Sequence, residues 1–141
     1  MRISASAIET LKTHVVFGYP YEICGFLVAH RGSGDVVWAR PANNATTGNP
    51  KIQYQIAPKE HEWVDKELDR IGLEVVGYYH SHPDHASYAS DTDRLNAWPG
   101  TYHLVVSCIE RVVRDMKVFV KPTWDAPEML EESLEIVDVA D

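Results

Sequence analysis

Residues 78–94 read YYHSHPDHASYASDTDR, a run in which histidine, serine and aspartate follow the end of an apolar strand. We expect that strand over residues 74–80. Because side chains two residues apart in a strand point the same way, His80 and His82 lie on one face. Pro83 then interrupts the strand pairing and turns the chain away. Two imidazoles at a strand end can meet one metal ion, although an H-x-H pair alone is a weak indication of a metal site.

Asp93 is the candidate third ligand, eleven residues beyond His82. It lies near the start of a short helix that we expect from Ser90 to the residue before Pro99. The loop over residues 83–89 is long enough to bring its carboxylate back to the two rings. Two histidines and one carboxylate leave the fourth tetrahedral position of zinc for water, as in catalytic zinc sites. Ser90 and Asp93 also have the spacing of a helix cap, and this structural role is compatible with metal binding because a capped turn holds a ligand in place.

Glu22 is the candidate general base of a water-activating hydrolase. It stands immediately before a buried strand expected over residues 23–30, where burial would raise the pKa of its carboxyl toward the useful range. The alternative is an exposed residue at a strand end, and spacing alone does not bring Glu22 to the metal. His85 also has two interpretations: it lines the site or contacts substrate, or it is an exposed loop histidine. The remaining histidines have no partner at ligand spacing and are expected to be ordinary: His14, His30, His61 and His103.

Two further helices are expected upstream of this stretch. The first begins at Ser6, which has the S-x-x-E spacing of a capping box with Glu9, and it ends at Gly18. Its buried face is expected to hold Ile8, Leu11 and Val15. The second begins at Pro58 and is capped by Gly72. Its buried face is expected to hold Val64, Leu68 and Ile71.

Short apolar runs predict the remaining strands, over residues 36–40, 52–56, 102–109, 116–120 and, near the C-terminus, 134–137. Helices and strands alternate at first, and the strands over 102–109 and 116–120 are close enough to form a hairpin. A single-domain mixed β-sheet flanked by helices fits this order, which places the chain in the α/β class.

The length of 141 residues suits one domain, residues 1–141. The net charge of −8 argues against binding to nucleic acid or to anionic membrane surfaces, because both would repel an acidic protein. No apolar run approaches the roughly 20 residues of a membrane span. The N-terminus lacks the apolar core of a signal peptide, so we expect a cytoplasmic protein. Cys24 and Cys108 lie in apolar runs and are expected to be buried thiols, while a redox or ligand role for Cys24 stays open because Glu22 is close.

Together these residues resemble the motif of the JAMM (MPN+, JAB domain) zinc metalloprotease family. That motif is a glutamate before an apolar strand, then H-x-H-P, then S-x-x-D about eight residues later. Here Glu22 precedes the strand, HSHP ends at Pro83, and Ser90 lies eight places after His82 with Asp93 three further on. The resemblance extends from about residue 6 to residue 120, most of the chain.

The resemblance implies a role for each residue. His80, His82 and Asp93 would ligate zinc, and Glu22 would take the proton from the attacking water and pass it to the leaving amine. Ser90 would donate a hydrogen bond to the oxyanion of the tetrahedral intermediate. The family fold is a mixed sheet with helices around it, like that of the zinc-dependent cytidine deaminases, and the expected order of elements agrees.

The resemblance also implies a substrate class. Family members cleave peptide or isopeptide bonds after the C-terminal tail of ubiquitin or ubiquitin-like proteins. The small bacterial members are nearest in length, and some resemble hydrolases that release cysteine from a β-grasp sulfur-carrier protein and expose its Gly-Gly end. Such a carrier is the implied partner. Asn43 and Asn44, in a loop that runs to Pro50, either help to hold the tail or simply form turns.

Two alternatives to this function remain. Some family relatives have lost their ligands and act as non-catalytic scaffolds, whereas others are peptidases that accompany phage tails and cell-wall hydrolases. A deaminase is disfavoured because no C-x-x-C supplies thiolate ligands. The identity of the released group and the oligomeric state do not follow from the sequence.

Overall fold

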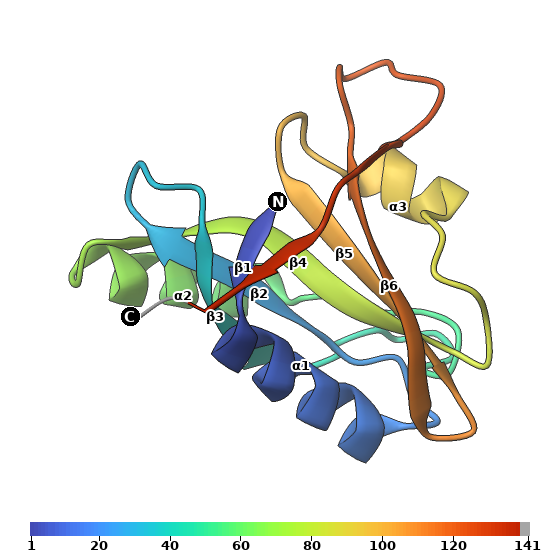
Figure 1. Cartoon of the computed structure of the whole chain (residues 1–141). Helices are drawn as coiled ribbons and strands as arrows, with labels where there is room; N and C mark the ends of the chain where they lie inside the picture. Colours follow the sequence, from blue (N-terminus) through green and yellow to red (C-terminus); the bar gives the residue numbers. More distant parts are fainter. Residues whose placement is uncertain (139–141) are drawn as a thin grey trace.

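A computed structural model describes residues 1–138, and these form one curled mixed sheet with helices around it (Figure 1). The helices are α1 (Ala5–Gly18), α2 (Pro58–Asp69) and α3 (Asp91–Asn96). The strands are β1 (Arg2–Ser4), β2 (Cys24–His30), β3 (Val36–Ala42), β4 (Leu73–Pro83), β5 (Tyr102–Ile109), β6 (Val112–Val120), β7 (Leu130–Glu132) and β8 (Glu135–Val137). This arrangement confirms the α/β class and the mixed sheet expected from the sequence.

The described strands lie in the order β7-β6-β5-β4-β2-β3-β1-β8. The long strand β4 is central to the site: it pairs antiparallel with β2 on one side and parallel with β5 on the other. Parallel neighbours need a crossover connection, and here residues 84–101 supply it, with α3 inside the crossover. The hairpin expected from β5 and β6 is confirmed, although β6 begins at Val112 rather than at residue 116.

Strand β2 is buried on both faces, which explains its continuous apolar run. On one face Leu27 belongs to the core beneath α1, which also holds Leu11 and Val15. On the other face Phe26 packs in a second core with α2. Figure 1 shows α1 lying along its face of the sheet. The helices therefore cover opposite faces, and the end of β2 that follows Glu22 is held between them.

The predicted cap of the first helix is wrong. The helix begins at Ala5, and Ser4 is its N-cap: the Ser4 hydroxyl accepts a hydrogen bond from the Ala7 amide at 3.1 Å. Ser6 lies inside the helix, so it forms no capping box with Glu9. The reason is β1, a three-residue strand that pairs with β3 and β8 and delivers the chain into the helix two residues early.

The strand predicted over residues 52–56 is also wrong. Residue 52 lies in a turn, and residues 53–56 have no regular secondary structure. The Asn44 side chain takes the place of a neighbouring strand, because its amide donates to the Gln53 carbonyl at 2.9 Å and accepts from the Gln55 amide at 3.1 Å. One backbone bond, from Ala45 to Gln55, completes the contact.

The second helix ends before the last residue of its predicted buried face. Val64 and Leu68 are buried as expected, but α2 ends at Asp69 and Ile71 is 67% exposed in the turn that follows. Gly72 occupies that turn with a φ of 74°, a conformation that favours glycine. The expected C-terminal strand is confirmed as β8, whereas β7 carried no recognised signal. No helix in residues 1–138 is both long and apolar enough to cross a bilayer.

Candidate metal centre

Two imidazoles meet at the end of β4, as their spacing predicts. The Nε2 atoms of His80 and His82 are 3.2 Å apart, and both side chains are buried. Strand β4 continues past His80 to Pro83 because β5 pairs alongside it, with His82 opposite Ser107. The flanking strands therefore hold both ring positions, and Pro83 ends the strand as expected.

The orientation of the His82 ring is set by the loop that follows it. Its Nδ1 lies 2.9 Å from the Ala86 carbonyl, so Nδ1–H donates there and Nε2 keeps its lone pair for the centre of the site. The loop is itself held by two serines. Ser107 donates to the His85 carbonyl and Ser87 donates to Asp115, each at 2.6 Å. Hydrogen bonds of this kind fix the tautomer and direction of a metal-binding histidine.

Asp93 reaches the same centre from α3. Its Oδ2 lies 3.4 Å from His80 Nε2. The predicted cap is confirmed: the Ser90 amide donates to Asp93 Oδ2 at 2.8 Å, and the Asp93 amide donates to the Ser90 hydroxyl at 3.1 Å. Burial alone would raise the pKa of Asp93, but His80 and the hydrogen bonds from Ser90 hold it well below its usual range. Asp93 is therefore a carboxylate at neutral pH.

Glu22 is buried beside both rings. Glu22, His80 and His82 each offer a ligand atom, and these atoms lie within 4.8 Å of one another. The backbone of Glu22 is fixed by a hydrogen bond from its amide to the Pro50 carbonyl and by one from the Asn44 side chain to its own carbonyl. Burial raises the pKa of Glu22 to about 7, opposed by His80 and reinforced by Asp93. The expected burial and its effect on the pKa are confirmed.

The donor set fits a divalent ion that prefers nitrogen and oxygen. The two Nε2 atoms and the Glu22 carboxylate lie within 4.8 Å of one another, whereas Asp93 lies outside that group and approaches it through its 3.4 Å contact with His80 Nε2. His80 Nδ1 is buried with no hydrogen-bond partner among the described residues. Cys24 and Cys108 are buried free thiols, as expected. Burial raises the pKa of Cys24 to about 12, so this residue supplies no thiolate at neutral pH. The site therefore suits zinc bound by imidazole and carboxylate.

Tyr54 is a site residue that the sequence analysis missed. Its ring stacks on His80, with centroids 4.5 Å apart and planes inclined by 22°. It comes from the segment over residues 52–56, and no motif marks it. Burial raises the pKa of the Tyr54 phenol, followed by the effect of Asp93, so the hydroxyl stays protonated.

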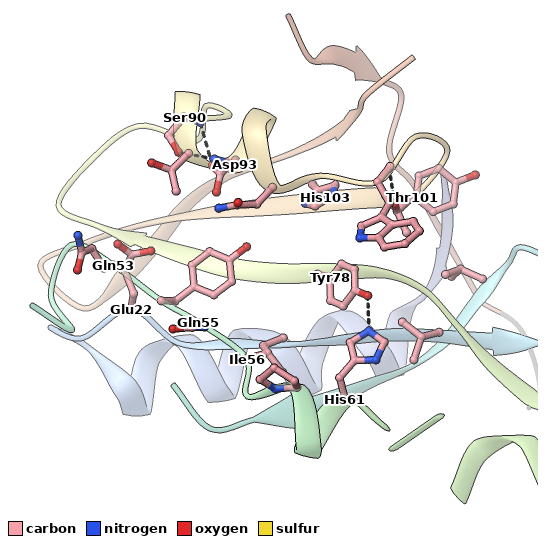
Figure 2. A pocket seen from close by; sticks show the side chains of 18 of the residues that line it. Glu22, Gln53, Gln55, Ile56, His61, Tyr78, Ser90, Asp93, Thr101 and His103 are labelled. Carbon is pink, nitrogen blue, oxygen red and sulfur yellow. Dashed lines mark hydrogen bonds between the residues drawn. The ribbon is translucent and has the colours of Figure 1, made fainter. Parts of the chain in front are cut away.

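A groove of about 1760 Å³ runs from this centre across the face of the sheet. Figure 2 shows Glu22, Ser90 and Asp93 at one end and Thr101 at the other. His85 lines the groove, which favours the first of its two interpretations. Neither Asn43 nor Asn44 is among the lining residues, and the Asn44 amide is engaged with its own chain, so the turn interpretation is favoured there.

Two histidines expected to be ordinary also line the groove. His61 comes from α2, and its Nε2 lies 2.5 Å from the Tyr78 hydroxyl. His103 comes from β5 and is buried, and neither of its ring nitrogens has a hydrogen-bond partner in residues 1–138. Burial lowers the pKa of His103 to about 4, so its ring is neutral at pH 7. Their spacing in the sequence gives no sign of this cluster, because it depends on how β4, β5 and α2 pack.

Two named proteins are similar to this chain over much of its length. A desampylase from Haloferax volcanii is 31% identical over 112 residues, which cover 76% of this chain and 80% of that protein. The histone deubiquitinase MYSM1 from Branchiostoma floridae is 34% identical over 97 residues, which cover 66% of this chain but only 12% of that much longer protein.

The fold has a solved counterpart of similar size. The solution structure of protein DSY2949 from Desulfitobacterium hafniense superposes with a TM-score of 0.79 at 24% identity, covering 98% of this chain and 93% of that one. The family model described as prokaryotic homologs of the JAB domain matches residues 4–120, which include the whole motif from Glu22 to Asp93. The chain therefore belongs to the prokaryotic JAB-domain family.

Proposed function

We propose that this protein is a zinc-dependent peptidase or isopeptidase that cleaves an adduct from the Gly-Gly tail of a ubiquitin-like β-grasp sulfur-carrier protein in the cytoplasm. Residues 1–141 form its single catalytic domain. The observation that carries the proposal is the pair of carboxylates with opposite pKa shifts beside two imidazoles. Asp93 is held ionised, as a metal ligand must be, whereas the pKa of Glu22 is near 7, as a general base requires.

His80, His82 and Asp93 would hold the zinc ion. Bound zinc supplies Lewis acidity, which polarises a carbonyl and makes a water acidic near neutral pH. Glu22 takes the proton from the attacking water at its carboxylate and returns it to the leaving amine. Its buried position beside His80 keeps that carboxylate within reach of the reacting atoms.

Ser90 has a hydroxyl proton to give to the substrate. Its Oγ already accepts the Asp93 amide at 3.1 Å, and this bond leaves the O–H free to donate. A donor fixed by a helix cap is preorganised, so it can stabilise the carbonyl oxygen of the substrate as that oxygen gains negative charge.

The groove suits an extended tail. The Gln53 carbonyl and both backbone groups of Gln55 bond to Asn44 and Ala45. The amide and carbonyl of Tyr54, which lies between these two residues, have no backbone partner among residues 1–138. A Gly-Gly tail has no side chains to obstruct it and can pair with such an edge.

The names of the relatives support the substrate class. A desampylase and a deubiquitinase remove ubiquitin-like proteins, and the desampylase is matched over most of its length. Two substrates belong to this class: a carrier that ends in a cysteine to be released, and a carrier joined through its C-terminus to a lysine side chain. They differ only in the group that leaves.

The test uses purified β-grasp carriers extended beyond Gly-Gly by cysteine, by a short peptide or by a lysine isopeptide. Mass analysis should show loss of the extension, dependent on zinc and abolished in Glu22→Gln. The matched control is Glu67→Gln on the exposed face of α2, which should cleave normally. If the zinc-loaded protein cleaves no carrier, the proposed function is wrong, and the result favours the non-catalytic scaffold. Cleavage of cell-wall peptides instead would favour the phage-tail type.

A further inference from the structure

The part of the groove beyond the metal centre contains His61, Tyr78 and His103, and we call these three residues the tail subsite (Figure 2). We propose that the tail subsite binds an arginine side chain of the substrate, at the residue that immediately precedes the Gly-Gly end of the carrier. This inference rests on the proposed function and specifies which tails the protein selects.

The position follows from strand geometry. Tyr78 lies two residues before His80 on the same face of β4, so it stands about 7 Å along the strand from the metal centre. An extended tail in the groove also advances about 3.3 Å per residue. The two glycines therefore span the distance between the scissile bond and Tyr78. The residue before them is the first with a side chain that can enter the tail subsite.

The hydrogen bonds of the tail subsite leave it short of donors. His61 Nδ1 lies 3.0 Å from the Asp65 carboxylate and its Nε2 faces the Tyr78 hydroxyl. The Asp65 carboxylate can only accept, so Nδ1–H donates to it, and in that tautomer Nε2 accepts the hydroxyl proton of Tyr78. The Tyr78 oxygen then has only lone pairs to offer. Asp65, His61 and Tyr78 form a chain of bonds that ends in an acceptor at the groove.

His103 supplies a second acceptor. Its ring lies against that of Tyr78, with centroids 5.8 Å apart. The side chain is only 6% exposed, and both nitrogens lack a hydrogen-bond partner in the part of the chain that the structure describes. A neutral imidazole always carries one lone pair, and leaving it unpaired in a buried place is costly. A donor from the substrate would remove that cost.

The charge around the tail subsite favours a cation. Glu62, Asp65 and Glu74 line the groove. Of its two lining lysines, Lys66 is paired with Glu62 at 3.0 Å, and Lys51 follows Pro50, whose carbonyl accepts the Glu22 amide at the metal end. Complementary charge of this kind selects a basic partner. Arginine fits better than lysine because its planar group has several donors, which can reach two acceptors at once. Trp98, at the same end and 65% exposed, offers a ring on which a guanidinium can stack.

The test measures binding of fluorescent tail peptides to Glu22→Gln, in which cleavage is blocked. The peptides end in Gly-Gly plus one adduct residue and carry Arg, Lys, Ala or Glu before the glycines. We expect the Arg peptide to bind about tenfold more tightly than the Ala peptide, a ratio typical of charge-assisted hydrogen bonds. Adding Tyr78→Phe or Asp65→Asn should reduce the ratio to within about twofold.

The control and the contrary outcomes are distinct. Adding Glu67→Gln removes the same charge from α2 outside the groove and should leave the ratio unchanged. If Tyr78→Phe fails to fold, the exposed Asp65→Asn variant still gives the answer. Equal binding of the Arg and Ala peptides, or tighter binding of the Glu peptide, would overturn the inference. Failure of the wild-type protein to cleave any carrier would instead contradict the proposed function, whatever the ratio.

Discussion

The hydroxyl of Tyr19 donates to the carboxylate of Asp84 at 2.7 Å and thereby joins the two segments that carry the site. Tyr19 precedes Glu22 by three residues, and Asp84 follows His82 by two. The Glu110 amide donates to the same carboxylate at 3.0 Å. The hydrogen bond from Glu110, followed by the one from Tyr19, lowers the pKa of Asp84, so the anchor is ionised at neutral pH.

Removing this link should affect catalysis more than folding. In Tyr19→Phe, Glu22 and His82 lose a shared anchor, and a small misplacement of catalytic groups is costly. We expect kcat to fall about two- to tenfold, with KM and zinc content nearly unchanged. Steady-state kinetics on the cleaved carrier, with metal analysis of the same sample, checks this. An unchanged kcat would show that each segment is held well enough by its own strand.

The zinc content of purified variants should distinguish the proposed metal ligands from neighbouring residues. His82→Ala and Asp93→Ala each remove one of the three proposed protein ligands, so the purified variants should retain less than about a tenth of an equivalent. His85→Ala is the matched control, because His85 lines the groove in the same crossover without meeting the two rings. It should keep the wild-type zinc content, measured by mass spectrometry of the metal. A full equivalent in His82→Ala would contradict the proposed ligand set.

The stability of the metal-free protein should depend on Glu22 and on pH. The native pKa of about 7 lies above the ordinary value of 4.5, so the native state binds more protons than the unfolded chain between these values. The stability contributed by Glu22 is therefore complete below pH 4.5 and is lost as the pH rises through 7. Glu22→Gln should exceed the wild type by about 1–2 kcal/mol at pH 8 and match it near pH 4.5.

Urea unfolding in the presence of a chelator, at pH 4.5, 6 and 8, measures this difference. His103 titrates in both proteins and contributes equally to both unfolding curves. Because His80 and Asp93 act on the pKa of Glu22, the difference measures the Glu22 carboxylate in the presence of these two groups. A larger free energy of unfolding for the wild type than for Glu22→Gln at pH 8 would mean that the Glu22 carboxylate is better solvated than its burial indicates.

Gly77 should not tolerate a side chain. A Cβ at this position would lie 2.4 Å from the backbone oxygen of Tyr102, where β4 and β5 run side by side. Gly77→Ala forces these strands apart and should cost about 1–3 kcal/mol in the free energy of unfolding. Denaturant unfolding tests this, with Glu67→Ala as an exposed control that should change stability by less than about 0.5 kcal/mol. Equal stability of the two variants would show that the strands separate without cost.

The local parts of the site could be predicted because short-range rules govern them. His80 and His82 share a face because strands have a period of two, and Asp93 is fixed by a cap three residues long. Glu22 is different. It reaches the rings only because β2 pairs with β4, placing Cys24 opposite His80, and no local pattern specifies that register. The family resemblance supplied this contact, whereas spacing did not.

The errors have the same origin. Ser4, rather than Ser6, caps α1 because β1 is held by strands from both ends of the chain. Residues 52–56 have the composition of a strand, but a side chain of Asn44 occupies the place of a partner strand. Tyr54 and His103 join the groove only through packing between distant segments. Each of these depends on tertiary contacts, some between nearby loop residues and some between distant segments, which hydrophobic periodicity does not encode.

The parallel pairing of β4 and β5 has a consequence for how such a protein can diversify. After His82 the chain must travel back the length of a strand before β5 begins, and this return path forms much of the groove wall, including His85 and Trp98. The sheet carries the histidines, while the return path shapes the entrance. Insertions or substitutions between residues 84 and 101 can therefore alter which tails are admitted without disturbing the strands beneath, provided that Asp93 keeps its place.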